Sequence, residues 1–128
     1  MKRRLLPLKL LAASGCGLFG EPDRSIVVDG VVVEAGTEEP LERIAVQLDR
    51  AAFSGPIRQR LAANTTGADG RFLVQRGYNI DGDYRIFAAD QRLFENSPGY
   101  YRTVGENTFY VQPGDRKTLR IEMEWTER

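Results

Sequence analysis

Apolar side chains recur at every second position through most of the chain after residue 25. Residues 44–48 read Ile-Ala-Val-Gln-Leu, and residues 119–125 repeat the alternation with Leu, Ile, Met and Trp. A period of two is typical of strands with one buried face. The expected extended segments, about seven in number, are Ser25–Glu34, residues 44–48, Arg58–Thr66, Arg71–Gln75, Asp83–Ala89, Arg102–Gln112 and Lys117–Trp125.

Turn signals separate these segments. Asp69-Gly70 and Asp81-Gly82 are strong turn pairs, and Gly55-Pro56 and Pro113-Gly114 also break the chain. Arg58–Thr66 fits either a strand or a short helix. We favour a strand because Asp69-Gly70, a pair typical of β-hairpin turns, follows it closely. We expect residues 91–99 to form an irregular loop, and no segment has a convincing long amphipathic pattern. The pattern predicts an all-β protein with a single antiparallel seven-stranded β-sandwich of Greek-key type.

The first fifteen residues differ from the rest of the chain. Lys2, Arg3 and Arg4 precede an apolar stretch from Leu5 to Ala13, which small residues follow. Nine helical residues rise only about 14 Å, too little to span a bilayer core. We therefore interpret residues 1–15 as a signal peptide, residues 16–25 as a tether and residues 26–128 as the β-sandwich domain.

The residues Ala13-Ser14-Gly15-Cys16 resemble the lipobox of bacterial lipoproteins. The resemblance implies that a diacylglycerol is attached to the Cys16 thiol and that the peptide is cut before it. Two or three acyl chains hold a protein on a membrane where one does not. In that family, a cysteine that is not followed by Asp usually marks a protein sorted to the outer membrane, and here Gly17 follows Cys16. The resemblance therefore implies that the protein lies in the bacterial cell envelope, on the periplasmic side of the outer membrane. The alternative is a protein without a lipid, whose lone thiol is an ordinary side chain.

The strand pattern is also similar to a known module. Thr65–Phe72 (TTGADGRF) matches a recurring central hairpin, Gly82–Ile86 matches the strand that follows, and Pro113-Gly114-Asp115 opens the closing strand. Together these segments resemble the carboxypeptidase regulatory-like domain and its transthyretin-like (prealbumin-like) relatives. The resemblance implies a prealbumin-like sandwich and no particular activity, because the matching residues are structural.

Composition narrows the function classes. Four of the 18 basic residues precede Cys16, which leaves 14 basic against 18 acidic residues and a net charge of −4. Nucleic-acid binding needs a concentrated basic surface, so we expect none. The chain has no histidine and one cysteine, which removes the commonest general base and the usual zinc ligands. We expect no catalytic residues, no metal site and no cofactor; Asp69, Asp81 and Asp83 are interpreted as turn residues rather than calcium ligands.

One segment has the composition of a binding surface. Gln91–Arg102 places aromatic and apolar side chains with an arginine around a Pro-Gly turn, and such residues are favoured interface anchors. The candidate surface consists of Leu93, Phe94, Tyr100, Tyr101 and Arg102. The alternative is that Phe94 and one tyrosine fold back over the core. We therefore expect a non-enzymatic, lipid-anchored envelope protein that acts as an interaction or scaffold module for an envelope protein or glycan. The alternative functions are an accessory domain of an envelope enzyme system and a hydrolase that works without histidine.

Overall fold

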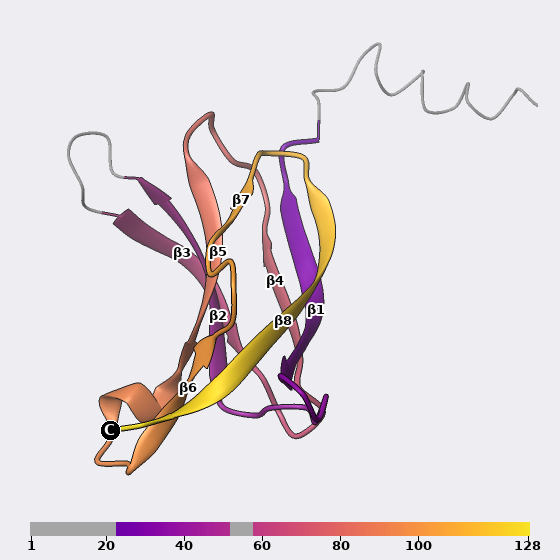
Figure 1. The fold of residues 1–128 in the computed structure, drawn as a ribbon. Helices are drawn as coiled ribbons and strands as arrows, with labels where there is room; N and C mark the ends of the chain where they lie inside the picture. The colour runs from indigo at the N-terminus through magenta and orange to yellow at the C-terminus, as the bar shows by residue number, and fades with distance from the viewer. Residues whose placement is uncertain (1–22, 52–57) are drawn as a thin grey trace, which may run out of the picture.

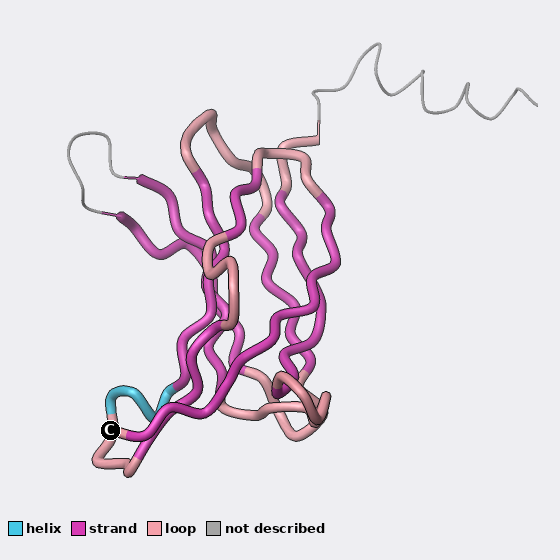
Figure 2. The backbone as a smooth tube through the Cα atoms, viewed as in Figure 1, coloured by secondary structure: helices cyan, strands magenta, loops and turns pink. Residues whose placement is uncertain are grey.

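The computed structural model describes residues 23–51 and 58–128, which form two packed β-sheets (Figures 1 and 2). The predicted signal peptide, Cys16, most of the tether and Gly55-Pro56 lie outside the described residues. The all-β sandwich prediction is confirmed. The strands are β1 (Ile26–Glu34), β2 (Ile44–Ala51), β3 (Arg58–Thr65), β4 (Arg71–Arg76), β5 (Tyr84–Asp90), β6 (Gly99–Thr103), β7 (Phe109–Val111) and β8 (Arg116–Glu127).

Each sheet contains four strands. Their orders are β4-β1-β8-β6 and β3-β2-β5-β7. Neighbouring strands are antiparallel except β1 and β8, which run parallel from Val27 beside Arg116 to Glu34 beside Met123. Consecutive strands β3 and β4 lie in different sheets, so Asp69-Gly70 turns the chain from one sheet to the other. The predicted turn is therefore present, but the predicted hairpin is wrong.

The strand count is eight, not seven. The predicted single segment Arg102–Gln112 covers the end of β6 and all of β7, because the chain crosses between the sheets at residues 104–108. Strand β6 pairs with β8 in the first sheet, and β7 pairs with β5 in the second. The predicted loop at residues 91–99 begins with a 3-10 helix, η2 (Gln91–Phe94), and its last residue starts β6.

The core lies between the two sheets, as the alternating pattern predicts. The inward residues of β1, β2, β5 and β8 are almost completely buried, and the largest are Ile26, Ile44, Leu48, Tyr84, Ile86, Ile121 and Met123. Gly30 permits a close approach of β1 and β8, because a Cβ at this position would lie 1.9 Å from the backbone oxygen of Leu119. This matches the close approach or bulge that a glycine inside a strand indicates.

The two ends of the sandwich carry different parts of the chain. Residues 23–25 approach β1 at the end that holds the β4–β5 loop and the β7–β8 turn, whereas η2 and the C-terminus lie at the opposite end (Figure 1). Strand β8 connects these ends, since it starts beside Asp23 and finishes beside η2.

Candidate functional site

A cleft of about 620 Å³ opens at the surface where the second half of β5 passes β6, an edge strand of the other sheet. Residues from β5, η2, β6, β8 and the 104–108 crossover line it. The main side chains on its walls are Arg85, Phe87, Asp90, Leu93, Tyr100, Tyr101, Arg102, Met123 and Glu124. A lining that mixes aromatic, apolar and charged side chains is typical of a recognition site.

The course of the backbone explains why the cleft lies here. Strand β7 pairs with β5 only from Tyr84 to Ile86, so the last residues of β5 have no neighbour from β7. The N–H of Gln91 donates to the carbonyl of Arg43 on the β2 side. Since backbone groups alternate in direction along a strand, those of Ala88 point the other way, toward the cleft.

Asp90 holds the floor of the cleft together. Its carboxylate is fully buried at the end of β5 and accepts three hydrogen bonds. The backbone N–H of Arg92 (3.0 Å) and its guanidinium (2.9 Å) donate to Oδ1, and the backbone N–H of Tyr101 (2.8 Å) donates to Oδ2. One side chain therefore caps η2 and fixes β6 beside β5.

Tyr101 forms the aromatic wall at the centre of the cleft. Its ring packs edge-on against Trp125, with 5.1 Å between ring centroids, and the guanidinium of Arg92 lies 5.7 Å from the ring centroid. The phenol oxygen lies 3.4 Å from a carboxylate oxygen of Glu34. Burial raises the pKa of Tyr101, and the negative charge of Glu34 raises it further. The ring is therefore held as a rigid neutral surface.

The structure brings together most of the predicted binding residues. Leu93, Tyr100, Tyr101 and Arg102 line the cleft, and Tyr101 also packs against the core, as the alternative predicted for one tyrosine. Phe94 does not fold back: its side chain is 80% exposed and stands at the end of η2, outside the cleft. Tyr100, Tyr101 and Arg102 lie on β6 rather than in a loop.

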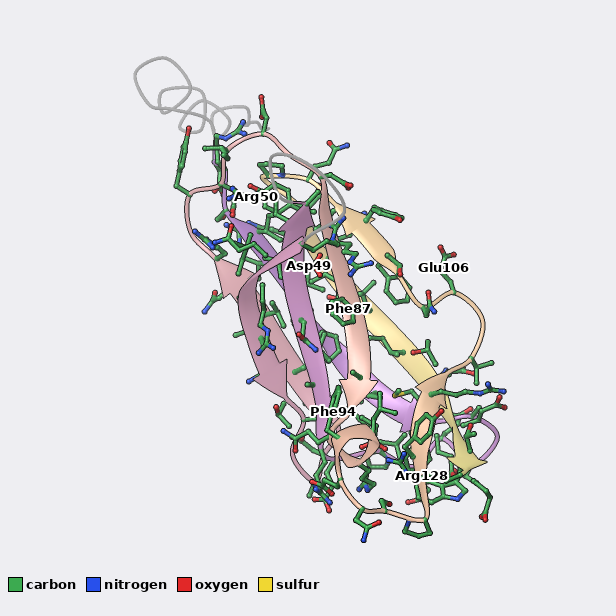
Figure 3. The ribbon with its side chains drawn as sticks, turned by 90° about the vertical axis from the view of Figure 1, so that its left-hand side faces the viewer. Asp49, Arg50, Phe87, Phe94, Glu106 and Arg128 are labelled. Carbon is green, nitrogen blue, oxygen red and sulfur yellow. The ribbon has the colours of Figure 1, made fainter. Side chains whose placement is uncertain are left out.

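Arg128 fastens this end of the molecule, and sequence reasoning missed it. Its guanidinium donates to the backbone carbonyls of Arg92, Leu93 and Glu95 and lies over the ring of Tyr100, 5.4 Å from the centroid. Figure 3 shows Arg128 and Phe94 at the same end. The C-terminal residue therefore shapes the cleft rim.

A second buried carboxylate, Asp49, lies on the outer face of the β3-β2-β5-β7 sheet (Figure 3). The pairing of β2 with β3 shifts register between Leu48 and Asp49. Arg58 and Arg85 donate from the flanking strands to Oδ1 at 2.6 and 3.0 Å. Burial would lower the pKa of Arg58, but its hydrogen bond with Asp49 raises it above the usual value. This cluster stabilises the outer face of the sheet. One of its members, Arg85, also lines the cleft.

Each of the three aspartates that could have suggested calcium, Asp69, Asp81 and Asp83, has a different hydrogen-bond or ion-pair partner. Asp69 accepts from the backbone N–H of Arg71 within its turn, Asp81 pairs with Arg24 and Asp83 pairs with Arg58. Within residues 23–51 and 58–128, no three acidic side chains gather at a point where they could hold a metal ion. The same residues contain no helix with the length and apolar character needed to cross a bilayer.

The sequence matches no protein-family model and no curated protein sequence. Among solved structures, similar ones include transthyretin from Sparus aurata, with 17% identity, a TM-score of 0.48 and coverage of 79% of this chain and 95% of that one. An (S)-allantoin synthase has 15% identity, a TM-score of 0.46 and coverage of 100% of this chain, which spans 61% of that protein. The minor pilin GBS52 of Streptococcus agalactiae has 19% identity, a TM-score of 0.41 and coverage of 84% of this chain and 45% of that one. These likenesses concern the fold.

Proposed function

We propose that this chain is a non-enzymatic, lipid-anchored protein of the bacterial cell envelope that binds an envelope protein or glycan at its cleft end. The cleft end consists of the cleft together with Phe94 and the η2 surface. We further propose that its domain is of the carboxypeptidase regulatory-like kind, a structural module whose role depends on what its loops bind.

The observation that carries the binding proposal is the joint exposure and rigidity of two apolar side chains at this end, Phe94 and Leu93. Phe94 is 80% exposed although it is apolar, and Leu93 beside it is also exposed. Both stand on backbone that Asp90 and Arg128 hold in place. Preorganised aromatic anchors lose little conformational freedom on binding, which is why they dominate the energetics of interfaces.

The anchoring proposal rests on the lipobox resemblance and on the short distance along the chain. Cys16 precedes Asp23, the first described residue, by seven residues. Lipid attached to this thiol would place the domain directly on the membrane surface, on the periplasmic side of the outer membrane. Metabolic labelling with a fatty acid tests it: the wild-type protein should be labelled and Cys16→Ser should not. An unlabelled wild-type protein that still begins at Met1 would refute the anchor.

The binding proposal is tested by crosslinking in intact envelopes. Phe94→Ala with Arg102→Ala removes two exposed side chains from the cleft end, whereas Tyr110→Ala removes a 65% exposed ring from the sheet face outside the cleft. A specific crosslinked product should be lost in the double variant and kept in the Tyr110 variant. Equal yields from both variants would refute the assignment of this surface. A partner that proves to be an enzyme would indicate the accessory role.

A further inference from the structure

The residues just before β1 are fastened to the β4–β5 loop, residues 77–83, which we call the tether loop. The guanidinium of Arg24 donates to the carbonyl of Asn79 at 2.6 Å, and the side-chain amide of Asn79 donates back to the carbonyl of Arg24 at 2.7 Å. Arg24 also pairs with Asp81 at 2.5 Å. These contacts fix the direction in which the chain leaves the sandwich.

The opposite side of the same short segment is bound to the β7–β8 turn. The N–H of Gly114 donates to the carbonyl of Ser25 at 2.7 Å, and Arg116 donates to the carboxylate of Asp23 at 2.9 Å. Hydrogen bonds from Ser25 and Arg116 hold the pKa of Asp23 below its usual range. Residues 23–25 are therefore part of this end of the domain and not a free linker.

The tether loop presents two large apolar side chains to solvent. Tyr78 is 64% exposed and Ile80 is 56% exposed, whereas Asn79 between them is only 3% exposed. Because Asn79 points inward and bonds to the chain at Arg24, its neighbours are held pointing outward. The guanidinium of Arg24 lies 5.7 Å from the centroid of the Tyr78 ring. Tyrosine, an aliphatic residue and arginine together suit the boundary between lipid headgroups and acyl chains.

The length of chain between the loop and the lipidation site sets how far this end can lie from the membrane. Asp23 follows Cys16 by seven positions along the chain. Even when fully extended, a chain of seven such steps reaches only about 25 Å. We propose that the tether loop rests in the interfacial layer of the bilayer that holds the Cys16 lipid, with Tyr78 and Ile80 in contact with its phospholipids. This inference rests on the lipid anchor of the proposed function.

The same arrangement directs the cleft away from the membrane. Strand β8 begins at Arg116, which binds Asp23, and ends at Glu127, before the residue that binds η2. Twelve residues of strand span up to about 36 Å. Figure 1 shows the N-terminal approach and the C-terminus at opposite ends of the sandwich. The cleft end therefore faces the periplasm, where a partner can reach it.

The test uses the full lipidated chain, inserted in phosphatidylcholine vesicles that contain brominated phosphatidylcholine as a quencher of tryptophan fluorescence. The chain has one tryptophan, Trp125, which lies near the cleft end. In a Trp125→Phe background, Tyr78→Trp places the probe in the tether loop and Phe94→Trp is the matched control at the cleft end. Brominated lipid should reduce the emission of the first variant about two-fold and leave that of the second and of wild-type Trp125 unchanged.

Flotation of the vesicles separates the two ways in which the inference could fail. If the wild-type chain does not float with the vesicles, or floats equally well as Cys16→Ser, the lipid anchor is wrong and the docking inference fails with it. If the chain floats through Cys16 but the probe at position 78 is not quenched, the anchor stands and the docking of the tether loop is refuted.

A second measurement avoids any added probe. Tyr78→Ser with Ile80→Ser should speed transfer of the lipidated chain between vesicles roughly ten-fold, because less apolar surface holds it to the bilayer. The matched control, Phe94→Ser with Leu73→Ser, removes two apolar side chains, 80% and 47% exposed, that lie outside the tether loop. Equal transfer rates for the two double variants would contradict the inference.

Discussion

Replacement of Asp90 by alanine should destabilise the domain through one identifiable loss. The carboxylate accepts from the guanidinium and N–H of Arg92 and from the N–H of Tyr101. The side chain of Arg92 is 20% exposed and can turn toward water, so we count only the two backbone donors. Buried donors that lose a charged acceptor cost about 1.5–3 kcal/mol each, and the effects are not additive, which gives a loss of about 3–4 kcal/mol. In a domain of this size the melting temperature should fall on the order of 15 °C.

Chemical denaturation followed by Trp125 fluorescence measures this loss, and hydrogen exchange at the Tyr101 amide locates it. Asp90→Asn keeps one acceptor oxygen and should lose about half as much stability. Asp69→Ala is the matched control, because its exposed carboxylate accepts only the N–H of Arg71, and it should cost less than about 1 kcal/mol. If Asp90→Ala unfolds at the wild-type denaturant concentration and the Tyr101 amide stays protected, the carboxylate is not the anchor of the cleft.

Three further predictions follow from contacts described above. Gly30→Ala should cost about 3 kcal/mol in urea denaturation, because its methyl group collides with the Leu119 carbonyl and separates β1 from β8; a loss under about 1 kcal/mol would contradict this. Asp49→Ala should cost about 2–3 kcal/mol, and a double-mutant cycle with Arg58→Leu should give a coupling of at least about 1 kcal/mol, whereas additive losses would argue against the pair. In a phenolate absorbance titration, Tyr101→Phe should remove a tyrosine that ionises above the usual pKa. Because the native state then holds this proton more tightly than the unfolded chain, stability should fall as pH rises from about 10 through the native value, and Tyr101→Phe should lose less over this range.

The alternation of side chains predicted most of the residues that face the core, although Trp125, the last of its alternating run, is 38% exposed. Ile44, Val46 and Leu48 are buried, and so are Ile121 and Met123, as a period of two requires. Turn chemistry was equally local, since a turn depends on adjacent residues such as those at Asp69-Gly70. These features could be predicted because each depends on residues close together in the sequence.

Pairing and crossing between sheets could not be predicted in the same way. Alternation gives the face of a strand but not its neighbour, so it says nothing of the parallel contact of β1 with β8, where Asp29 and Thr118 are 89 residues apart. The break between β6 and β7 had a signal in Gly105-Glu106-Asn107, a polar run in which Gly105 has a φ of 75°. Val104 directly before this run and Phe109 two residues after it masked the signal.

The candidate site shows the same division between local and distant information. Leu93, Tyr100 and Arg102 are near in sequence and could be predicted together, whereas Arg85 and Phe87 come from β5 and join them only through the fold. Acidic residues in strands are usually solvent-exposed, which is why the burial of Asp90 was not expected.

The cleft follows from the need to protect the edges of two open sheets. On one side, β3 and β4 lie edge to edge, and the side-chain amide oxygen of Asn64 accepts from the N–H of Leu73 across the gap. On the other side, the crossover at residues 104–108 shortens β7 and leaves β5 without a neighbour beyond Ile86. An unpaired edge invites aggregation unless its groups are satisfied or covered. Asp90 satisfies the edge N–H of Tyr101, and the crossover covers the opening but does not fill it. Because the cleft is a product of backbone topology, changes in its side chains other than Asp90 should alter what binds there while the cleft itself persists.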